Sequence, residues 1–245
     1  MGFDTDLNLN ILLPVYNEEK RLRTGVEQTV AYLDKKDTLR YQLSIVDNAS
    51  TDQTENIAKE LCQQYRDKVH YLRITEKGVG AAFRAGVAAN TSDIVGYMDI
   101  DLSTDIRHIL DMMDIFKKEA TIGMVNASRW SQHSDTSGRK WYRNITSIGL
   151  VWLLKVVFKL KASDAICGFK FFRRQTVESL IAEAGSSTNG WFYLIELLIR
   201  AERNNTNICE LPVHWEDDSE NSTVHTCALI KEYLHQIIAL KQRLR

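Results

Sequence analysis

The most informative stretch of the chain is IVGYMDIDLS, residues 94–103. Its first five residues form a short apolar run that predicts a buried strand, and two acids, Asp99 and Asp101, follow in alternate positions. Residues i and i+2 of an extended chain point to the same side, so we expect the two carboxylates to lie together. Like charges this close are unfavourable unless a cation lies between them. The pair therefore predicts a divalent-metal site, with capping of the following helix as the alternative interpretation.

Further strand and helix patterns alternate on both sides of this stretch. Strands are expected at residues 10–15, 42–46, 69–74, 94–98 and 122–127, and helices at about 18–36, 53–66, 80–90 and 105–118. This alternation predicts an α/β fold, with a mostly parallel, Rossmann-like sheet and helices on both faces. After residue 128 helices dominate, and we expect them at about 143–160, 175–184, 190–204 and 224–244, with one more strand near residues 208–213.

Composition and charge limit the classes of protein to consider. The chain has 245 residues, two prolines and no Gly/Ser-rich linker, so we expect one continuous domain over residues 1–222, followed by an amphipathic helix over residues 223–245. A net charge of −1 offers no basic field for nucleic acid. Four dispersed cysteines and an N-terminus without signal-peptide features predict a cytoplasmic location. No stretch reaches the roughly 20 apolar residues that a membrane-spanning helix needs.

Another acid marks the end of a second predicted strand. Asp47 follows the run QLSIV, residues 42–46, and open α/β sheets bind ligands at the carboxyl ends of parallel strands. A carboxylate at this edge can accept hydrogen bonds from a nucleobase or a ribose. Ser50 and Thr51, which follow Asp47 closely, are instead typical of a helix cap.

Small residues begin the next predicted helix, in KGVGAAF, residues 77–83. A dinucleotide-binding fingerprint would need glycine where Phe83 stands, so that motif is excluded. Gly80 would still allow a ligand to approach the backbone closely. Tight packing of the helix against the sheet explains the same residues, and the sequence leaves both interpretations open.

Several motifs, taken in order, resemble family 2 glycosyltransferases with the GT-A fold. They are PVYNE (14–18), VDNASTD (46–52), KGVGAAFRAG (77–86), MDIDLS (98–103) and ASR (127–129). Three later motifs are similar to the branch of dolichyl-phosphate and polyprenyl-phosphate sugar synthases, and these are DAICGFK (164–170), GWFY (190–193) and LPVHW (211–215). The resemblance extends from about residue 8 to about residue 223, and the QxxRW motif of processive members is absent.

The resemblance implies roles for particular residues. Those that would contact the nucleotide sugar are Pro14, Tyr16, Glu18, Asp47, Lys77, Gly80, Asp99 and Ile100. The expected ligands of Mg²⁺ or Mn²⁺ are Asp99, Asp101 and Ser103. The expected catalytic residues are Asp101, Arg129, Asp164 and Lys170. An acceptor phosphate would be bound by Arg129, Arg139 and Arg143, although a solvated polar loop is the alternative for the last two.

Two positions depart from the family pattern. Asn48 stands where many relatives have a second acid, so one contact to the nucleotide is expected to differ. Ala127 replaces the usual glycine before the Ser-Arg motif, which is a minor change.

The resemblance implies inverting transfer of a hexose from a nucleotide sugar to a polyprenyl or dolichyl phosphate. UDP-glucose is the favoured donor and GDP-mannose is the other candidate. A lipid phosphate is already anionic, so it needs orientation and charge neutralisation by arginines more than it needs a base. A glycan, a glycolipid or a protein is the alternative acceptor. A non-catalytic nucleotide-sugar-binding subunit is a further alternative, against which the intact Asp99 and Asp101 pair argues.

Two amphipathic helices bear on membrane association. The helix at about residues 143–161 has a wide apolar arc flanked by Trp152, Lys155 and Lys159, which is typical of a helix in a membrane interface. A core or dimer helix is the alternative. The C-terminal helix would dock on the domain, on a partner subunit or on anionic lipid. We therefore expect a cytoplasmic protein that is peripheral on the cytosolic face of a membrane if its acceptor is a lipid, and homo-oligomerisation is left open.

Overall fold

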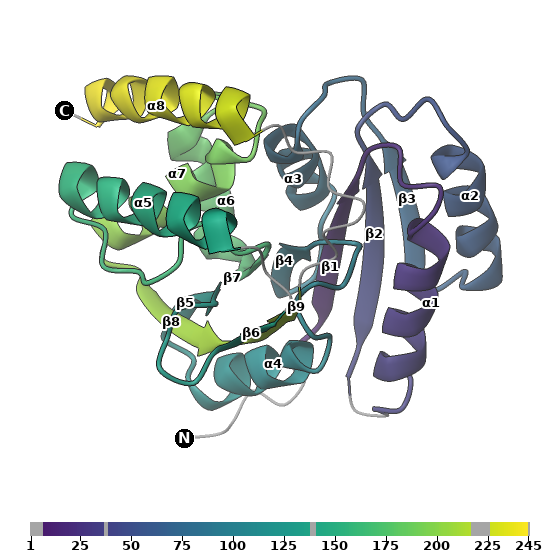
Figure 1. Ribbon diagram of the computed structural model, residues 1–245. Coiled ribbons are helices and arrows are strands. Elements are labelled where there is room, and N and C mark those ends of the chain that lie inside the picture. The colour runs from purple at the N-terminus through teal and green to yellow at the C-terminus, as the bar shows by residue number, and fades with distance from the viewer. Residues whose placement is uncertain (1–6, 37–38, 138–140, 217–225, 245) are drawn as a thin grey trace.

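A seven-stranded sheet runs through the centre of the molecule (Figure 1). The computed structural model describes residues 7–36, 39–137, 141–216 and 226–244. The strands of this sheet are β1 (Leu9–Val15), β2 (Tyr41–Asp47), β3 (Val69–Arg73), β4 (Ile94–Met98), β5 (Ile122–Ser128), β7 (Phe169–Arg173) and β8 (Asn207–Pro212). Their order is β3-β2-β1-β4-β7-β5-β8.

Neighbouring strands are parallel except around β7. β1 pairs in parallel with β2 and β4, and β2 pairs in parallel with β3. β8 is parallel to β5, whereas β7 is antiparallel to both β4 and β5. The mostly parallel sheet that the sequence predicts is therefore confirmed, with one inserted antiparallel strand that the sequence analysis missed. It also missed a small parallel pair, β6 (Asp135–Ser137) with β9 (His214–Glu216).

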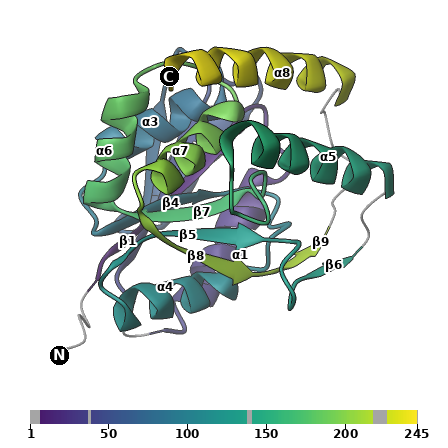
Figure 2. The same cartoon turned by 90° about the vertical axis from the view of Figure 1, so that its left-hand side faces the viewer.

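Helices cover both faces of the sheet, as the sequence predicts (Figures 1 and 2). Helix α4 lies on one face, and α3, α6 and α7 lie on the other, as the side view in Figure 2 shows. The bounds of the helices are α1 (Leu22–Leu33), α2 (Thr54–Gln64), α3 (Val79–Ala88), α4 (His108–Lys118), α5 (Trp141–Phe158), α6 (Arg174–Ala184), α7 (Phe192–Arg203) and α8 (Thr226–Arg243).

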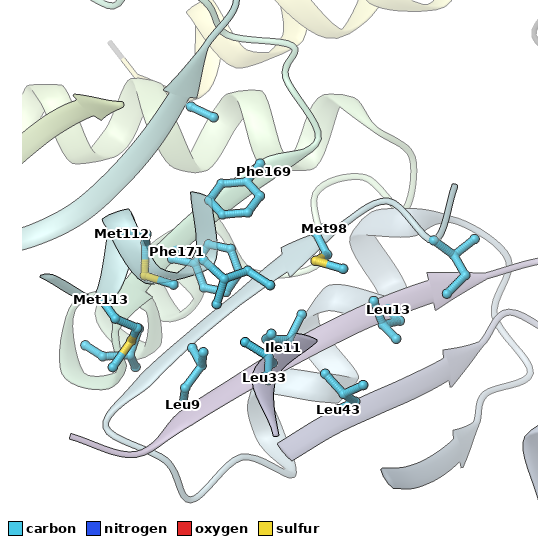
Figure 3. Close-up of a cluster of buried hydrophobic side chains, with 14 of the residues drawn as sticks. Leu9, Ile11, Leu13, Leu33, Leu43, Met98, Met112, Met113, Phe169 and Phe171 are labelled. Carbon is cyan, nitrogen blue, oxygen red and sulfur yellow. The ribbon is translucent and has the colours of Figure 1, made fainter. Parts of the chain in front are cut away.

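The side chains of β1 fill a separate core on each face. Leu9, Ile11 and Leu13 pack with Met112 of α4 and other apolar residues on one face (Figure 3). Leu12 points to the other face, into a core that includes residues of α3, α6 and α7. Successive side chains of a strand point to opposite faces, so a strand covered on both sides is apolar at nearly every position. All five residues of β4 are buried for this reason.

The C-terminal part of the chain is rich in helices, as predicted. Helix α8 runs alongside α5 in both views (Figures 1 and 2) and contacts α5 and α7. Its buried residues Tyr233, Ile237 and Leu240 belong to the core that α7 lines. The division into residues 1–222 and 223–245 stays a prediction. Within the described part of the chain, no helix combines the length and apolar character that crossing a bilayer requires.

Candidate active site

The loops that follow β1 and β2 are hydrogen-bonded to each other at one edge of the sheet. The Asn17 backbone N–H donates to Ser50 Oγ (2.9 Å), and the Thr51 N–H donates to Asn17 Oδ1 (2.8 Å). Asn17 adopts a φ of 55°, a left-handed conformation that asparagine tolerates better than most residues. Ser50 therefore accepts a bond from the neighbouring loop, and no side chain caps α2 at Gln53. These bonds hold the residues after both strands at the carboxyl edge of the sheet.

The acids that follow β4 lie at the same edge. Asp101 Oδ1 accepts hydrogen bonds from the Ser103 backbone N–H (3.0 Å) and from Ser103 Oγ (2.5 Å). Burial and the neighbouring Asp101 carboxylate raise the pKa of Asp99 to about 8, although Lys170 and Arg129 act in the opposite direction. The pKa is raised because the positive charges of Lys170 and Arg129 do not offset the cost of burying the Asp99 carboxylate beside Asp101.

Asp99 occupies space that exists only because residue 168 is glycine. A Cβ built on Gly168 would lie 1.8 Å from Asp99 Oδ2. The two residues meet because β7 pairs with β4 in antiparallel register, with Phe169 opposite Met98. The antiparallel insertion of β7 thus brings the CGFK motif against the acid pair.

An arginine that the sequence analysis did not single out connects two of the acids. Arg21 Nε and Nη2 donate to the two carboxylate oxygens of Glu18, at 2.8 and 2.7 Å. Arg21 Nη1 also forms an ion pair with Asp101 Oδ2 at 3.9 Å. Arginine with glutamate three residues before it is a common helix-surface pair, so the sequence contained no signal that would have placed Arg21 beside the acid pair.

Arg129 and Asp164 form a buried ion pair next to the acids. Arg129 Nε donates to Asp164 Oδ2 (2.7 Å) and Nη2 donates to Oδ1 (3.1 Å). Asp164 Oδ1 also accepts the backbone N–H groups of Ile166 (2.9 Å) and Cys167 (3.2 Å). Burial alone would raise the pKa of Asp164, but the charge and hydrogen bonds of Arg129 outweigh it and hold that pKa below its ordinary value. The pair therefore fixes the loop that carries Gly168.

Lys170 is completely buried in β7. Its Nζ donates to the Cys167 carbonyl (2.6 Å), and burial lowers the pKa of its ammonium group. The Asn126 side chain, opposite Lys170 in the register of β5, donates to the Asp164 carbonyl (2.7 Å). Lys170 therefore holds the loop that carries Gly168 through its hydrogen bond to the Cys167 carbonyl.

Two residues predicted to contact the nucleotide lie together at the surface. Tyr16 is 45% exposed, and Lys77 Nζ lies 4.9 Å from the centre of its ring and donates to its hydroxyl group at 3.1 Å. An exposed aromatic ring with a cation on it offers a surface for a flat, anionic ligand. Pro14 pairs with Val46 in the sheet, and Ile100 is buried against α1, close to Gly25.

Two other predicted nucleotide contacts, Asp47 and Gly80, are occupied by protein groups. Asp47 is fully buried and accepts hydrogen bonds from Ser50 N–H (2.8 Å), Tyr71 Oη (2.7 Å) and Arg73 Nη1 (3.3 Å). Gly80 N–H donates to the Asn189 carbonyl (2.7 Å), and a Cβ at Gly80 would lie 2.5 Å from Tyr193 Cβ. Close packing is thus a sufficient reason for glycine at residue 80, and nucleotide contacts at Asp47 and Gly80 stay predictions.

The departure at Asn48 has a structural explanation. Asn48 Nδ2 donates to the Val15 carbonyl (3.2 Å), and Asn48 Oδ1 accepts from the Gly78 N–H (3.1 Å). A carboxylate could accept the second bond but could not donate the first. Asn48 therefore connects the end of β1 to the start of α3.

Of the three arginines predicted to bind an acceptor phosphate, Arg129 forms the buried ion pair with Asp164, and the other two are only partly placed. Arg139 lies outside the described residues. Arg143 is in the first turn of α5, and the structure describes its backbone alone. Their predicted role is neither supported nor opposed by the geometry.

Comparison with known proteins identifies the family. A family model described as glycosyl transferase family 2 matches residues 10–181, which is more than half of the chain. The chain belongs to glycosyl transferase family 2. The intact order of motifs from PVYNE to CGFK is explained by this membership.

Curated relatives of this family 2 glycosyltransferase include AglD of Haloferax volcanii, 28% identical over 211 residues, which are 86% of this chain and 33% of AglD. The human dolichyl-phosphate β-glucosyltransferase is 28% identical over 224 residues, which are 85% of this chain and 67% of the human protein. This glycosyltransferase thus spans about a third of one relative and about two thirds of the other. The predicted resemblance to the dolichyl-phosphate and polyprenyl-phosphate branch is confirmed.

Solved structures share its fold. Glucosyl-3-phosphoglycerate synthase of Mycobacterium tuberculosis in complex with UDP superposes with a TM-score of 0.71, at 16% identity over 96% of this chain and 80% of that one. The complex of the same synthase with Mn²⁺, UDP-glucose and phosphoglyceric acid gives 0.70, at 16% identity and the same coverage. The GT-A type of α/β fold that the sequence predicts is confirmed for this glycosyltransferase.

The acid pair of this glycosyltransferase fits a hard divalent cation. Among the described residues, no group of three or more His, Cys, Asp or Glu side chains is placed to hold a metal ion. Mg²⁺ and related ions are often bound by one or two carboxylates, with substrate phosphates as further ligands. Asp99, with its raised pKa, and Asp101, with Oδ1 held by Ser103, suit such a two-carboxylate arrangement, and their role as metal ligands stays a prediction.

Proposed function

We propose that this glycosyltransferase moves a hexose, with inversion, from a nucleoside diphosphate sugar to a dolichyl or polyprenyl phosphate, and that UDP-glucose is the donor. The observation that carries the proposal is the Asp99 and Asp101 pair at the carboxyl end of β4, with Gly168 leaving space for the Asp99 carboxylate. The names of the relatives support a lipid phosphate as acceptor and glucose as the sugar.

Asp99 and Asp101 would hold Mg²⁺ or Mn²⁺ together with the diphosphate of the donor. The bound cation would neutralise the charge that develops on the departing diphosphate. The Ser103 hydroxyl group donates to Asp101, so we assign Ser103 the task of orienting that carboxylate. Tyr16 and Lys77 would bind the nucleotide at the exposed end of the site, with Glu18 and Asp47 fixing the loops around it.

The acceptor phosphate needs a positive site that orients one of its oxygens towards the anomeric carbon. Arg143, at the start of α5, and Arg139 are the proposed phosphate-binding residues. Arg129 is buried and paired with Asp164, so its proposed part is to position the loop that carries Gly168, just before β7. Replacing Arg143 with Ala should raise KM for the lipid phosphate more than KM for the donor.

The surface of α5 and α8 suits a lipid acceptor. Trp152 is 65% exposed, and Ile148 and Val156 are exposed one turn before and after it. On α8, Leu234 and Ile238 are exposed one turn apart. Lys155 is exposed next to the α5 stripe, and apolar side chains flanked by lysine bind anionic lipid surfaces. These side chains support a membrane-bound enzyme, and we propose the cytosolic face of the membrane as its location.

The test is sugar transfer from radiolabelled UDP- and GDP-sugars to a short-chain polyprenyl phosphate, with Mn²⁺, with Mg²⁺ and with chelator. We expect a labelled lipid from UDP-glucose that requires the metal. Asp101→Asn should abolish the product, and Asp114→Asn, at an exposed acid on α4 paired only loosely with Lys118 at 4.0 Å, should leave it unchanged.

Other outcomes point to the alternatives. Hydrolysis of the donor without formation of labelled lipid would indicate that the acceptor is a glycan, a glycolipid or a protein. Nucleotide-sugar binding without turnover would indicate a binding subunit. A labelled lipid formed only from GDP-mannose would show that the donor is GDP-mannose and not UDP-glucose.

A further inference from the structure

The guanidinium group of Arg21 forms an ion pair with one of the proposed metal ligands, Asp101. Both carboxylate oxygens of Glu18 accept hydrogen bonds from it, at 2.7 and 2.8 Å. This bidentate contact fixes the plane of the guanidinium group. Its remaining nitrogen, Nη1, lies 3.9 Å from Asp101 Oδ2. Arg21 therefore has a defined position beside the acid pair.

Asp101 does not depend on Arg21 for its orientation. Oδ1 of this carboxylate accepts both the backbone N–H and the hydroxyl group of Ser103, and these two bonds hold the carboxylate plane from within its own loop. Arg21 approaches the other oxygen, Oδ2. The contribution of Arg21 to Asp101 is thus chiefly its charge.

We propose that Arg21 is a built-in counter-ion of the metal site, which weakens binding of the cation to the empty enzyme. The inference rests on the proposed function, because it takes Asp99 and Asp101 as metal ligands. A positive charge held next to Asp101 Oδ2 offsets part of the attraction that the two carboxylates exert on a divalent cation. A bound diphosphate adds negative charge on the other side and restores the attraction.

The counter-ion has a consequence for the order of binding. The cation binds weakly to the acids alone and tightly with the nucleoside diphosphate, so metal and donor enter together. In the empty enzyme Arg21 also reduces the repulsion among Glu18, Asp99 and Asp101. Arg21 acts through its charge in this scheme and touches no reacting atom.

The experiment measures Mn²⁺ binding without turnover, from the electron paramagnetic resonance signal of free Mn²⁺, with and without UDP. We expect Arg21→Gln to bind Mn²⁺ about tenfold more tightly than the wild type in the absence of UDP. UDP should then increase Mn²⁺ affinity less in Arg21→Gln than in the wild type. Arg21→Lys keeps the charge and should behave as the wild type does.

Arg23→Gln is the matched control. Arg23 lies two residues later, in the first turn of α1, and forms ion pairs with Glu27 at 3.7 Å and with Glu60, so its loss changes the net charge equally and should leave Mn²⁺ affinity unchanged. Thermal unfolding provides a second readout. The metal-free Arg21→Gln protein should melt at a lower temperature than the wild type, and saturating Mn²⁺ should reduce the difference.

Two results would overturn the counter-ion role. If Arg21→Gln binds Mn²⁺ no more tightly than the wild type, while UDP promotes Mn²⁺ binding in both, Arg21 is not a counter-ion and the proposed function stands. If the wild type binds no Mn²⁺ even with UDP, the metal site of the proposed function is itself wrong.

Discussion

The carboxylate of Asp99 lies where the side chain of residue 168 would be, because residue 168 is glycine. A Cβ there would come within 1.8 Å of Asp99 Oδ2 and within 2.8 Å of Asp99 Oδ1. Flexible side chains can move away from such a contact, but Asp99 immediately follows a fully buried strand. The position of a proposed metal ligand thus depends on a residue that lies 69 positions later in the chain.

The first prediction concerns this contact. Gly168→Ala should displace the Asp99 carboxylate and reduce sugar transfer on the order of 100-fold, since a shift of about 1 Å in a reacting group has that effect. Mn²⁺ binding in the presence of UDP should weaken in parallel. Gly149→Ala, on α5 where a Cβ would meet nothing within 4 Å, is the control and should keep full activity. Normal Mn²⁺ binding by Gly168→Ala would show that Asp99 is not a ligand.

The second prediction concerns the buried pair of Arg129 and Asp164. Asp164→Asn leaves the Arg129 guanidinium without its charged partner in a buried site, and such a change lowers the free energy of unfolding by about 3–5 kcal/mol. Urea denaturation followed by circular dichroism measures it. The same substitution at the exposed Asp114 should change stability by less than about 1 kcal/mol. If Asp164→Asn also lowers the free energy of unfolding by less than about 1 kcal/mol, the ion pair with Arg129 does not stabilise the fold as we expect.

The third prediction follows from the raised pKa of Asp99. Its folded-state pKa of about 8 lies above its ordinary value of 3.8. The protonated form is therefore favoured by folding, and the stability that Asp99 contributes to the metal-free protein is fully present below about pH 4 and is lost as pH rises to about 8. A metal ion favours the ionised form and releases a proton when it binds.

The measurement is the melting temperature at pH 6 and pH 8, with and without Mn²⁺. Stabilisation by Mn²⁺ should be larger at pH 8, because less proton release is then required. Asp99→Asn should remove most of this difference. If Mn²⁺ raises the melting temperature of the wild type equally at pH 6 and pH 8, Asp99 is already ionised in the metal-free protein.

The fourth prediction concerns the exposed stripe on α5. Trp152→Ser should reduce co-sedimentation with vesicles that contain anionic lipid, because the indole is the largest exposed apolar group among the side chains that the structure describes on that helix. Since Trp152 is 65% exposed, the variant should melt at the wild-type temperature. Ile238→Ser tests whether α8 takes part in the same surface. A Trp152→Ser protein that binds vesicles normally would exclude α5 as the membrane contact.

Much of the fold is determined by local sequence. β4 can be predicted because every one of its residues is apolar or glycine and both of its faces are covered. The Asp99 and Asp101 pair is predicted from alternation in an extended chain, but β4 ends at Met98, and the two acids lie in a turn closed by a hydrogen bond from the Leu102 N–H to the Asp99 carbonyl (3.3 Å). The parallel direction of β1, β2, β3 and β4 follows from the alternation of strands and helices, because a helix between two strands forms a crossover connection.

The sequence alone thus determined the parallel half of the sheet, the acid pair, and the sheet edge at which open α/β folds usually bind ligands. Only the tertiary structure decided what surrounds that pair. Gly168 reaches Asp99, and Lys170 lies in the sheet, because β7 is inserted antiparallel between β4 and β5. Arg21 reaches Asp101 from the loop before α1. These are contacts between distant segments, and they depend on strand pairing and packing that no local pattern of residues specifies.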